Sequence, residues 1–592
     1  MTAAPLTDAQ IAAAHPIQPI ARIAADAGID EDLLIPYGRH MAKVDVHALT
    51  APEDGRVVLV TGISPTPAGE GKTTVTVGLA DGLNMLAGQA DAPAAVAGSR
   101  TVVALREPSL GPVFGIKGGA TGGGHAQVVP MEAINLHFTG DFHAITSAHN
   151  LLCALVDNHV QQGNALGIDP RTIALKRALD MNDRSLRDVV TGLGGRTQGV
   201  PREGGFEITV ATETMAVFCL AADLADLKER LGRITVGHTY DGEPVTASQI
   251  GPHGAQGAMA VLLKDAISPN LVQTLGGTPA LVHGGPFANI AHGANSVIAT
   301  RTARRLGDLV ITEAGFGADL GGQKFMDITA VAGGFPPAAV VVVATVRALK
   351  LQAGLSLRDV KAGAAETAAI TGRDAEAVRA EHLDALRTGT ANLARHVANM
   401  QEYGVPVVVG VNRFTQDEDA ELEVLRAWGA EHGVPVAVAD VWGGGGEGSL
   451  ELARLLGEHL PAPGEPAAEV TGRWEEDMDV EERIQAVVRR VYRGARAELT
   501  PAARRQLAQL RDRGLDRLPV CMAKTQYSFS DDPALLNAPE GFTVTVRELS
   551  AKTGAGFVVA LTGAVMTMPG LPASPAADRM DVAEDGTVTG LF

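Results

Sequence analysis

Short runs of apolar, often β-branched residues recur along most of the chain, and longer amphipathic or alanine-rich segments separate them. These runs predict strands. Several runs are continuous rather than alternating, which is typical of strands buried on both faces of a sheet. Strands that alternate with helices indicate βαβ units and a mainly parallel sheet. The expected strands are 56–61, 101–105, 280–283, 308–312, 339–344, 405–411 and 434–440.

The two ends of the chain depart from this alternation. The first fifty residues are predicted to be helical, with Thr7 and Gln10 in a capping-box pattern before an alanine-rich stretch. Near the other end, the proline-rich segment 461–466 predicts a linker. Beyond the linker we expect a smaller α/β unit, with a charged helix at 481–496 and strands at 519–523 and 542–547.

The patterns together predict an α/β protein of three domains. We expect a P-loop NTPase-like, mainly parallel sheet in a large N-terminal domain, with two smaller α/β domains after it. One boundary is placed where apolar strands give way to a charged helical stretch near 361–375, and the other is placed at the linker. The expected domains are 1–365, 366–465 and 466–592.

The composition argues against nucleic acid and membranes as binding partners. The 592 residues include 49 Lys+Arg and 68 Asp+Glu, a net charge of -19, and they contain no basic run that would bind nucleic acid or an anionic membrane. The most apolar stretch, 338–346, is about half as long as a membrane span. The three cysteines are dispersed, which argues against disulfides and structural zinc. Without a signal-peptide pattern at its N-terminus, the chain is expected to be cytoplasmic.

The strongest local motif is TGISPTPAGEGKTT at 61–74, which lies between an expected strand and an expected helix at 75–86. Backbone N–H groups of such a loop bind phosphate, a lysine reaches the terminal phosphates and a hydroxyl ligates Mg²⁺. Lys72 and Thr73 suit the last two roles, although Thr66 replaces the usual first glycine. The expected ATP-binding residues are Thr66, Pro67, Ala68, Gly69, Glu70, Gly71, Lys72, Thr73 and Thr74, with Thr73 as the metal ligand.

Charged residues follow two further expected strands. Arg106 comes directly after the strand at 101–105, where an arginine can bind a carboxylate or a phosphate through two hydrogen bonds. A surface ion pair with Glu107 is the alternative. The strand at 308–312 is followed by Glu313 and, six residues later, by Asp319, and an acidic residue there could hold the hydration shell of Mg²⁺.

A second glycine-rich segment, GGGGEG at 443–448, fits the pattern GxGxxG between a strand and an expected helix at 449–459. Taken alone, it would indicate dinucleotide binding and an NAD-dependent oxidoreductase. However, no clear acidic residue ends a strand about twenty residues later to bind the ribose. The redox interpretation is therefore kept as an alternative.

Aromatic residues follow two neighbouring strands of the second expected domain. Phe414 lies in the segment Asn412-Arg413-Phe414-Thr415, which is similar to the guanine-binding NKxD motif except that Thr415 replaces the aspartate. Trp442 follows the next strand. Two aromatic rings at adjacent strand ends could bind a flat heterocycle between them, and core packing is the alternative.

Polar residues cluster within 135–150, where His137, Asp141, His143 and His149 suggest a metal site. Their spacing matches no established metal motif, and histidines in such a setting are more often hydrogen-bonded structural residues. We therefore do not expect a metal site there.

Taken together, these stretches resemble the formate–tetrahydrofolate ligase family along almost the whole chain. Within the resemblance, Thr121 and His125 stand where the family usually has alanine and tyrosine, and residues 351–354 also depart from its pattern. The matching segments are TPAGEGKTT at 66–74, REPSLGPVFGIKGG at 106–119, QVVPMEAINLHFTGDFHAIT at 127–146, VHGGPFANIAHGANS at 282–296, ITEAGFGADLG at 311–321, VATVRALK at 343–350 and MAKTQYSFS at 522–530.

The resemblance implies an activity and a role for several residues. ATP with Mg²⁺ phosphorylates formate, and N10 of tetrahydrofolate attacks the formyl phosphate to give 10-formyltetrahydrofolate. On this resemblance we expect formate and tetrahydrofolate to be the substrates, the monovalent cations K⁺ or NH₄⁺ to activate the enzyme, and the chain to form a homotetramer. The implied catalytic residues are Lys72, Arg106 and Asp141, and the implied folate-binding residues are Glu107, Phe414 and Trp442.

Two other functions compete with this one. A P-loop switch or partitioning ATPase would share the phosphate loop and the parallel sheet, but it would turn over ATP without formate or folate. An NAD-dependent oxidoreductase would use the glycines at 443–448 and would leave Lys72 without a role. Neither alternative explains the long matching segments.

Overall fold

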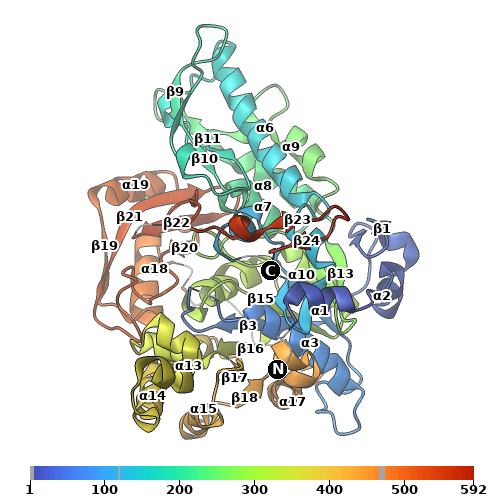
Figure 1. The fold of residues 1–592 in the computed structure, drawn as a ribbon. Coiled ribbons are helices and arrows are strands. Elements are labelled where there is room, and N and C mark those ends of the chain that lie inside the picture. Colours follow the sequence, from blue (N-terminus) through green and yellow to red (C-terminus); the bar gives the residue numbers. More distant parts are fainter. Residues whose placement is uncertain are drawn as a thin grey trace.

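The computed structural model describes residues 6–67, 69–117, 121–465, 474–475, 477–563 and 565–591. Its main feature is a large, mainly parallel sheet with helices on both faces (Figure 1), which confirms the predicted α/β fold class. Every strand predicted for this sheet is present. These strands are β3 (Arg56–Gly62), β4 (Thr101–Leu105), β14 (Pro279–Val282), β15 (Leu309–Glu313), β16 (Pro337–Ala344), β17 (Val407–Asn412) and β18 (Val436–Ala439).

The strands of the sheet follow the order β14-β4-β15-β3-β16-β17-β18, and each neighbouring pair is parallel. Beyond β14 the sheet turns antiparallel through β13 (Asn270–Thr274), which pairs with β2 (Ala42–Val44) and β6 (Ala126–Val129). The parallel strands all end at one edge of the sheet. Residues that follow them are therefore brought together there.

Alternate residues of the central strands pack into two separate cores. On β3, Val58 and Val60 face a core built with α3 (Lys72–Ala87) and α17 (Leu450–His459). The intervening residues face the opposite core, to which α10 (Val297–Leu306), α12 (Val346–Gln352) and α14 (Ala375–Gln401) contribute. Burial on both faces explains why these strands are continuous apolar runs in the sequence.

A helical region with small two-stranded sheets is inserted between β6 and β13 and projects at the top of Figure 1. The short strands β11 (Thr235–His238) and β12 (Pro244–Thr246) form one of its antiparallel pairs. Its longer helices are α6 (Asp141–Gln161), α7 (Glu213–Leu220), α8 (Leu224–Arg233) and α9 (Gln256–Leu263).

The C-terminal unit has its own four-stranded sheet and its own hydrophobic core, coloured orange to red in Figure 1. The two strands predicted at 519–523 and 542–547 are confirmed. Its strands follow the order β19 (Arg496–Leu499), β21 (Thr543–Lys552), β22 (Phe557–Thr562) and β20 (Val520–Ala523), and its helices include α18 (Val480–Ala486) and α19 (Pro501–Asp512).

The helix predicted at 481–496 is too long. Helix α18 ends at Ala486, a π-helical turn continues to Val491, and Arg496 already begins β19. Arg493 has a φ of 63°, a left-handed conformation that ends a right-handed helix. The charged sequence did not reveal this local break.

The prediction of an entirely helical N-terminus is also wrong in part. The capping box of Thr7 and Gln10 is present at the start of α1 (Asp8–Ala14), and α2 (Ile20–Asp26) follows. The chain then turns into two strands, β1 (Leu34–Pro36) and β2. Pairing of β2 with the distant β13 decides this conformation, so no local pattern could predict it.

The strands β17 and β18 extend the same sheet as the first predicted domain, and the boundary drawn at 365 lies within α13 (Leu357–Thr371). The linker 461–466 falls at the edge of the described residues. The division into three domains stays a prediction. No helix in the described part of the chain is long and apolar enough to cross a membrane.

Candidate functional site

The phosphate-loop candidate lies at the carboxyl edge of the sheet, between β3 and α3. Lys72 is the first residue of α3, and Gly69 and Gly71 before it have φ values of 83° and 67°. A side chain disfavours that conformation, so these glycines shape the turn into the helix. A Cβ at Gly62 would lie 3.1 Å from Cδ of Lys72, so a glycine leaves room for the lysine. The predicted strand–loop–helix arrangement is confirmed, while Ala68 lies outside the described residues.

The ends of neighbouring strands hold this loop in place. The carboxylate of Glu70 accepts hydrogen bonds from the backbone N–H of Thr66 at 2.6 Å and from the hydroxyl of Thr345, which follows β16. The side-chain amide of Asn412 at the end of β17 donates to the carbonyl of Glu70 at 3.0 Å. Arg347 donates to the carbonyl of Gly69. The loop is therefore fixed from β16 and β17 as well as from its own strand.

Charged groups from three strand ends converge beside the loop. The hydroxyl of Thr73 donates to Glu313 Oε2 at 2.9 Å, and Arg106 Nη2 lies 3.3 Å from Glu313 Oε1. Burial lowers the pKa of Lys72, and the nearby carboxylates of Glu313 and Glu70 oppose that effect. The structure thus brings together Lys72, Thr73 and Arg106 as predicted. It also identifies Glu313, rather than Asp319, as the acidic residue at this point.

The position of Arg106 suits an anion-binding role. Its side chain is 24% exposed, and its Nε–H is buried without a hydrogen-bond partner among the described residues. A Cβ at Gly315 would lie 2.9 Å from Nη1 of Arg106, so the backbone after β15 approaches the guanidinium closely. An arginine with a free donor, next to a lysine at a helix N-terminus, can bind a small carboxylate close to a phosphate.

The hydroxyl of Thr73 and the carboxylate of Glu313 form an oxygen donor set, which is the set that Mg²⁺ prefers. Thr73 is in the first turn of α3 and Glu313 reaches it from the end of β15, beside the lysine and the helix N-terminus that favour bound phosphate. These residues therefore fit a nucleotide with its Mg²⁺ ion. The expected metal role of Thr73 itself stays a prediction.

Glu107 and Asp141 meet in a second polar cluster next to this site. Asp141 forms a buried ion pair of 2.8 Å with Lys43 and accepts a hydrogen bond of 2.8 Å from Asn270. Burial raises the pKa of Glu107 well above its usual range, and the negative charges of Asp141 and Asp180 act in the same direction. Oε2 of Glu107 is buried without a partner among the described residues. The cluster therefore places a buried carboxyl, whose surroundings favour its protonated form, beside a carboxylate held by Lys43 and Asn270.

The aromatic residue Phe414 lies close to the phosphate loop. The guanidinium of Arg347 is 3.7 Å from the centre of its ring, and the same guanidinium contacts Gly69. The backbone N–H of Phe414 donates to Asp417 at 2.8 Å, and burial raises the pKa of Asp417 to about 6. Phe414 is thus placed beside the nucleotide candidate rather than in the hydrophobic core.

Trp442 has different neighbours. Its indole N–H donates to Asp8 of α1 at 3.1 Å, and its carbonyl accepts from the backbone of His125 at 2.9 Å. A Cβ at Gly124 would lie 2.0 Å from the carbonyl oxygen of Trp442, so the loop before β6 depends on glycine here. Among the described residues no ring contact joins Trp442 and Phe414, and the predicted sandwich of a heterocycle between them stays a prediction.

The glycines at 443–448 have a packing role in the structure. A Cβ at Gly446 would lie 2.9 Å from Cβ of Asp81 on α3, and a Cβ at Gly448 would lie 2.0 Å from the carbonyl oxygen of Asp440. The hydroxyl of Ser449 donates to the carbonyl of Gly78 at 2.7 Å. The segment therefore packs along the side of α3 and against Asp440, which explains Gly446 and Gly448 without a dinucleotide.

Other polar residues singled out in the sequence have structural partners. His149 is buried and bonded to Thr214 at 3.0 Å and to the carbonyl of Lys176 at 2.7 Å. Asp319 forms a buried ion pair of 2.8 Å with Lys524 of the C-terminal unit. These contacts explain why the two residues are polar and buried.

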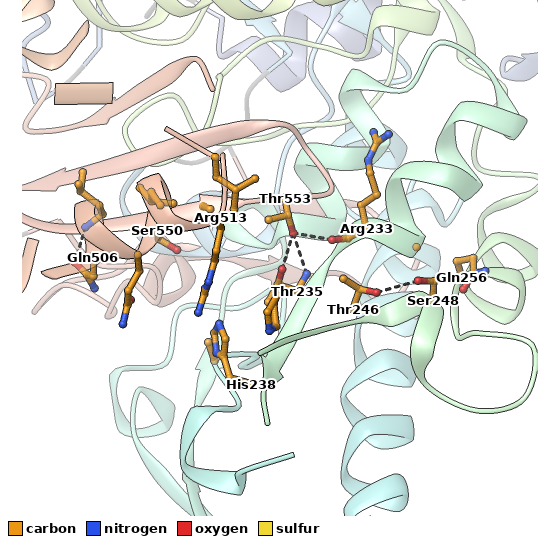
Figure 2. Close-up of a pocket in the computed structure, with 18 of the residues that line it drawn as sticks. Arg233, Thr235, His238, Thr246, Ser248, Gln256, Gln506, Arg513, Ser550 and Thr553 are labelled. Atoms are coloured by element: carbon orange, nitrogen blue, oxygen red, sulfur yellow. Dashed lines mark hydrogen bonds between the residues drawn. The ribbon is translucent and has the colours of Figure 1, made fainter. Parts of the chain in front are cut away.

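A large cavity of about 990 Å³ lies elsewhere, between α8, β11 and the C-terminal unit. Figure 2 shows Thr553 of that unit hydrogen-bonded to Thr235 and to the backbone of Arg233, with Arg513 extending toward His238. None of the residues predicted for substrate binding lines this cavity.

Sequence reasoning missed several residues of the site. Lys43 lies in a three-residue strand with no motif around it, and its pairing with Asp141 spans 98 positions. Thr345 and Arg347 lie in the VATVRALK segment at 343–350 but belong to no phosphate-binding pattern. Asn412 was noticed as part of an incomplete NKxD motif. Its position at the end of a strand was the signal that could have placed it at the loop, because this strand, β17, pairs with β16 in the structure.

Comparison with known proteins agrees with this geometry. The family model for formate–tetrahydrofolate ligases matches residues 6–592. The formate–tetrahydrofolate ligases of Staphylococcus aureus strains MSSA476 and NCTC 8325 / PS 47 are each 54% identical over 588 residues, which cover 99% of this chain and all of each relative. The chain belongs to the formate–tetrahydrofolate ligase family.

Membership of this family confirms the resemblance found in the sequence. It disfavours the switch ATPase and the oxidoreductase, because the family model and the relatives that match almost the whole chain are formate–tetrahydrofolate ligases. Two of the departures noted above, Thr121 and His125, have hydrogen-bond partners in the structure. The hydroxyl of Thr121 accepts a bond of 3.4 Å from Asn135, and the backbone of His125 bonds Trp442. Residue roles within the site stay predictions of the geometry and the resemblance.

Proposed function

We propose that this protein is a formate–tetrahydrofolate ligase that forms 10-formyltetrahydrofolate from formate, ATP and tetrahydrofolate. The observation that supports the activity best is the cluster at the start of α3, where Lys72, Thr73 and Arg106 surround Glu313. The cluster pairs a phosphate-binding lysine with an arginine suited to a carboxylate. A nucleotide switch needs the phosphate-binding lysine but binds no carboxylate substrate.

The reaction needs two group transfers at one place. A carboxylate oxygen of formate attacks the γ-phosphorus of ATP, the bond to ADP breaks, and formyl phosphate forms. N10 of tetrahydrofolate then attacks the formyl carbon, loses its proton and expels phosphate. Formate alone would have to lose oxide, so phosphorylation provides the leaving group. Such chemistry depends on positioning and charge neutralisation more than on a protein nucleophile.

The residues of the chain divide these tasks. Lys72 neutralises the transferring phosphoryl group, and Arg106 orients formate and then formyl phosphate. The loop from Thr66 to Thr74 binds ATP through its backbone N–H groups. Thr73 and Glu313 would hold Mg²⁺, which neutralises phosphate charge when bound. Glu107, Phe414 and Trp442 bind the folate, and Asp141 lies near the reacting amine.

The assembly and cofactors follow from the family resemblance. We propose a cytoplasmic homotetramer that uses ATP with Mg²⁺ and is activated by K⁺ or NH₄⁺. Comparing initial rates in K⁺ and Na⁺ buffers tests the activation, and light scattering during size-exclusion chromatography tests the tetramer. Equal rates in both salts, or a monomer, would contradict these two parts without affecting the chemistry.

The activity is tested by incubating the protein with formate, MgATP and tetrahydrofolate and measuring methenyltetrahydrofolate after acidification. We expect product that requires all three substrates and falls about a hundred- to a thousandfold in Arg106→Ala. Arg387→Ala, which changes an exposed arginine paired with Asp384, is the matched control. ATP hydrolysis by the folded protein without any formyl-folate would favour the switch ATPase instead.

A further inference from the structure

One side chain joins two segments that the proposed function assigns to different substrates. The guanidinium of Arg347 lies 3.7 Å from the centre of the Phe414 ring, and its Nη2 donates to the carbonyl of Gly69 in the phosphate loop. Its Nε–H is buried and has no partner among the described residues. A single guanidinium therefore touches both the proposed folate platform and the proposed ATP loop.

A second link connects the same two segments through the backbone. Asn412, two residues before Phe414, donates to the carbonyl of Glu70 at 3.0 Å. A Cβ at Gly71 would lie 2.4 Å from Nδ2 of this asparagine, so the contact with the loop is close. If residues 69–71 move when nucleotide binds, this contact would therefore also displace Asn412 and the backbone that carries Phe414.

The start of α12 completes the connection. Thr345 caps this helix by accepting a hydrogen bond from the backbone of Ala348, and its hydroxyl donates to the carboxylate of Glu70. Arg347 is in the first turn of the same helix. The position of Arg347 is thus tied to the phosphate loop at two points, Glu70 and Gly69.

The guanidinium also restricts how a ligand can use the ring. It covers one face of Phe414, so a flat heterocycle must stack on the opposite face. Arginine is suited to this task because its planar group can stack on a ring and donate a hydrogen bond at the same time. A lysine ammonium lacks the planar surface and the fork of donors.

We propose that Arg347 is a positioning residue that couples nucleotide binding to folate binding. Nucleotide in the phosphate loop fixes the carbonyl of Gly69, which fixes Arg347 and so orients Phe414 for the pterin ring. Tetrahydrofolate then binds more tightly to the nucleotide complex than to the free protein. By linkage, tetrahydrofolate raises the affinity for nucleotide by the same factor. This inference rests on the proposed function, which assigns Phe414 to the folate.

The test measures this factor in both directions without turnover. Calorimetry gives the Kd of a non-hydrolysable ATP analogue with Mg²⁺, with and without saturating tetrahydrofolate and in the absence of formate. The Kd of tetrahydrofolate is measured with and without the analogue. We expect a factor of about five or more in the wild-type protein, which is the lower end of typical coupling between sites.

Arg347→Lys and Arg347→Gln should still bind each ligand alone, but their coupling factor should fall to about one. Phe414→Leu should bind nucleotide normally, lose affinity for tetrahydrofolate and lose the coupling. Arg426→Lys, an exposed arginine that pairs with Glu423 and Glu451 on the surface, is the matched control and should keep the full factor.

Three results would overturn the coupling. These are a wild-type factor of one, a wild-type factor retained in both Arg347 variants, and equal weakening of both ligands with an unchanged factor. The last result would mean that Arg347 only supports the fold. Failure of the proposed function looks different, because the wild-type protein itself would then bind no tetrahydrofolate and make no formyl-folate.

Discussion

Two glycine-rich segments flank the same helix, α3, and use their glycines in opposite ways. At the N-terminus of α3, Gly69 and Gly71 adopt positive φ, and a Cβ at Gly69 would meet nothing within 4 Å. Along the side of α3, a Cβ at Gly446 or Gly448 would lie within 3 Å of neighbouring atoms. The first segment is open at Gly69 and shaped mainly by backbone conformation, although Gly71 lies close to Asn412, whereas the second is packed tightly at Gly446 and Gly448.

The difference shows what a glycine motif needs before it indicates a ligand. Both segments follow a parallel strand and precede a helix, and the second fits GxGxxG more closely than the first fits a P-loop. However, the first is accompanied by Lys72, Thr73 and the charged pair of Arg106 and Glu313. The surrounding charges, rather than the glycine spacing, separate a binding loop from a packing contact.

The largest expected effect is at the open segment. Lys72→Ala should lower kcat by about a hundred- to a thousandfold, because one preorganised charge on the transferring phosphoryl group is lost. Initial rates of formyl-folate formation measure the effect, and circular dichroism checks the fold. Lys264→Ala, which removes an exposed lysine paired with the adjacent Asp265, should retain activity. Similar rates in Lys72→Ala and Lys264→Ala would show that Lys72 has no role in the reaction.

A buried acid on the packed side of α3 gives the next effect. Burial raises the pKa of Asp81 from 3.8 to about 6, although Thr274 donates to its carboxylate. The folded state therefore binds this proton more tightly than the unfolded state does. The contribution of this group to the free energy of unfolding is fully present below pH 3.8, its pKa in the unfolded chain. It is lost as the pH rises through about 6, its pKa in the folded protein.

Asp81→Asn removes this titration and should gain stability relative to wild type as pH rises from 4 to 6. The gain should level off above pH 6 at no more than about 3 kcal/mol, the free energy of a pKa difference of about two units. Urea unfolding at several pH values measures it. A difference between the two proteins that does not change with pH would show that the carboxyl is not perturbed.

The packed segment itself should be sensitive to one methyl group. Gly448→Ala would place a Cβ 2.0 Å from the carbonyl oxygen of Asp440 and should cost about 1–3 kcal/mol of unfolding free energy. Gly444→Ala in the same segment meets no atom within 4 Å and should be nearly neutral. Denaturant midpoints compare the two. Equal stability, combined with NAD binding that Gly448→Ala abolishes, would restore the dinucleotide interpretation.

The smallest effect is expected at Gly69. Alanine there meets no neighbour, but it must adopt a φ near 83°, which costs roughly 1–2 kcal/mol. We expect Gly69→Ala to weaken binding of a MgATP analogue by about tenfold with little loss of overall stability. Titration calorimetry and thermal unfolding separate the two quantities. Unchanged nucleotide affinity would show that the left-handed turn is not needed in the bound loop.

The sequence predicted the parts of the fold that local patterns determine. Strands such as β16 are buried on both faces, so their apolar runs are unmistakable, and the loop at 61–74 carries its own chemistry. The short strands β2 and β13 were not predicted, because their pairing with distant segments stabilises them. For the same reason, Lys43 and Arg347 entered the site only when packing brought them there.

The isotopic composition of the released phosphate tests most directly whether the open segment of α3 serves formate activation. The protein is supplied with ¹⁸O-labelled formate, MgATP and tetrahydrofolate, and the phosphate is analysed by mass spectrometry. If formyl phosphate forms at this loop, each phosphate carries one ¹⁸O atom and equals 10-formyltetrahydrofolate in amount. Unlabelled phosphate that is released whether or not formate is present would contradict the ligase mechanism.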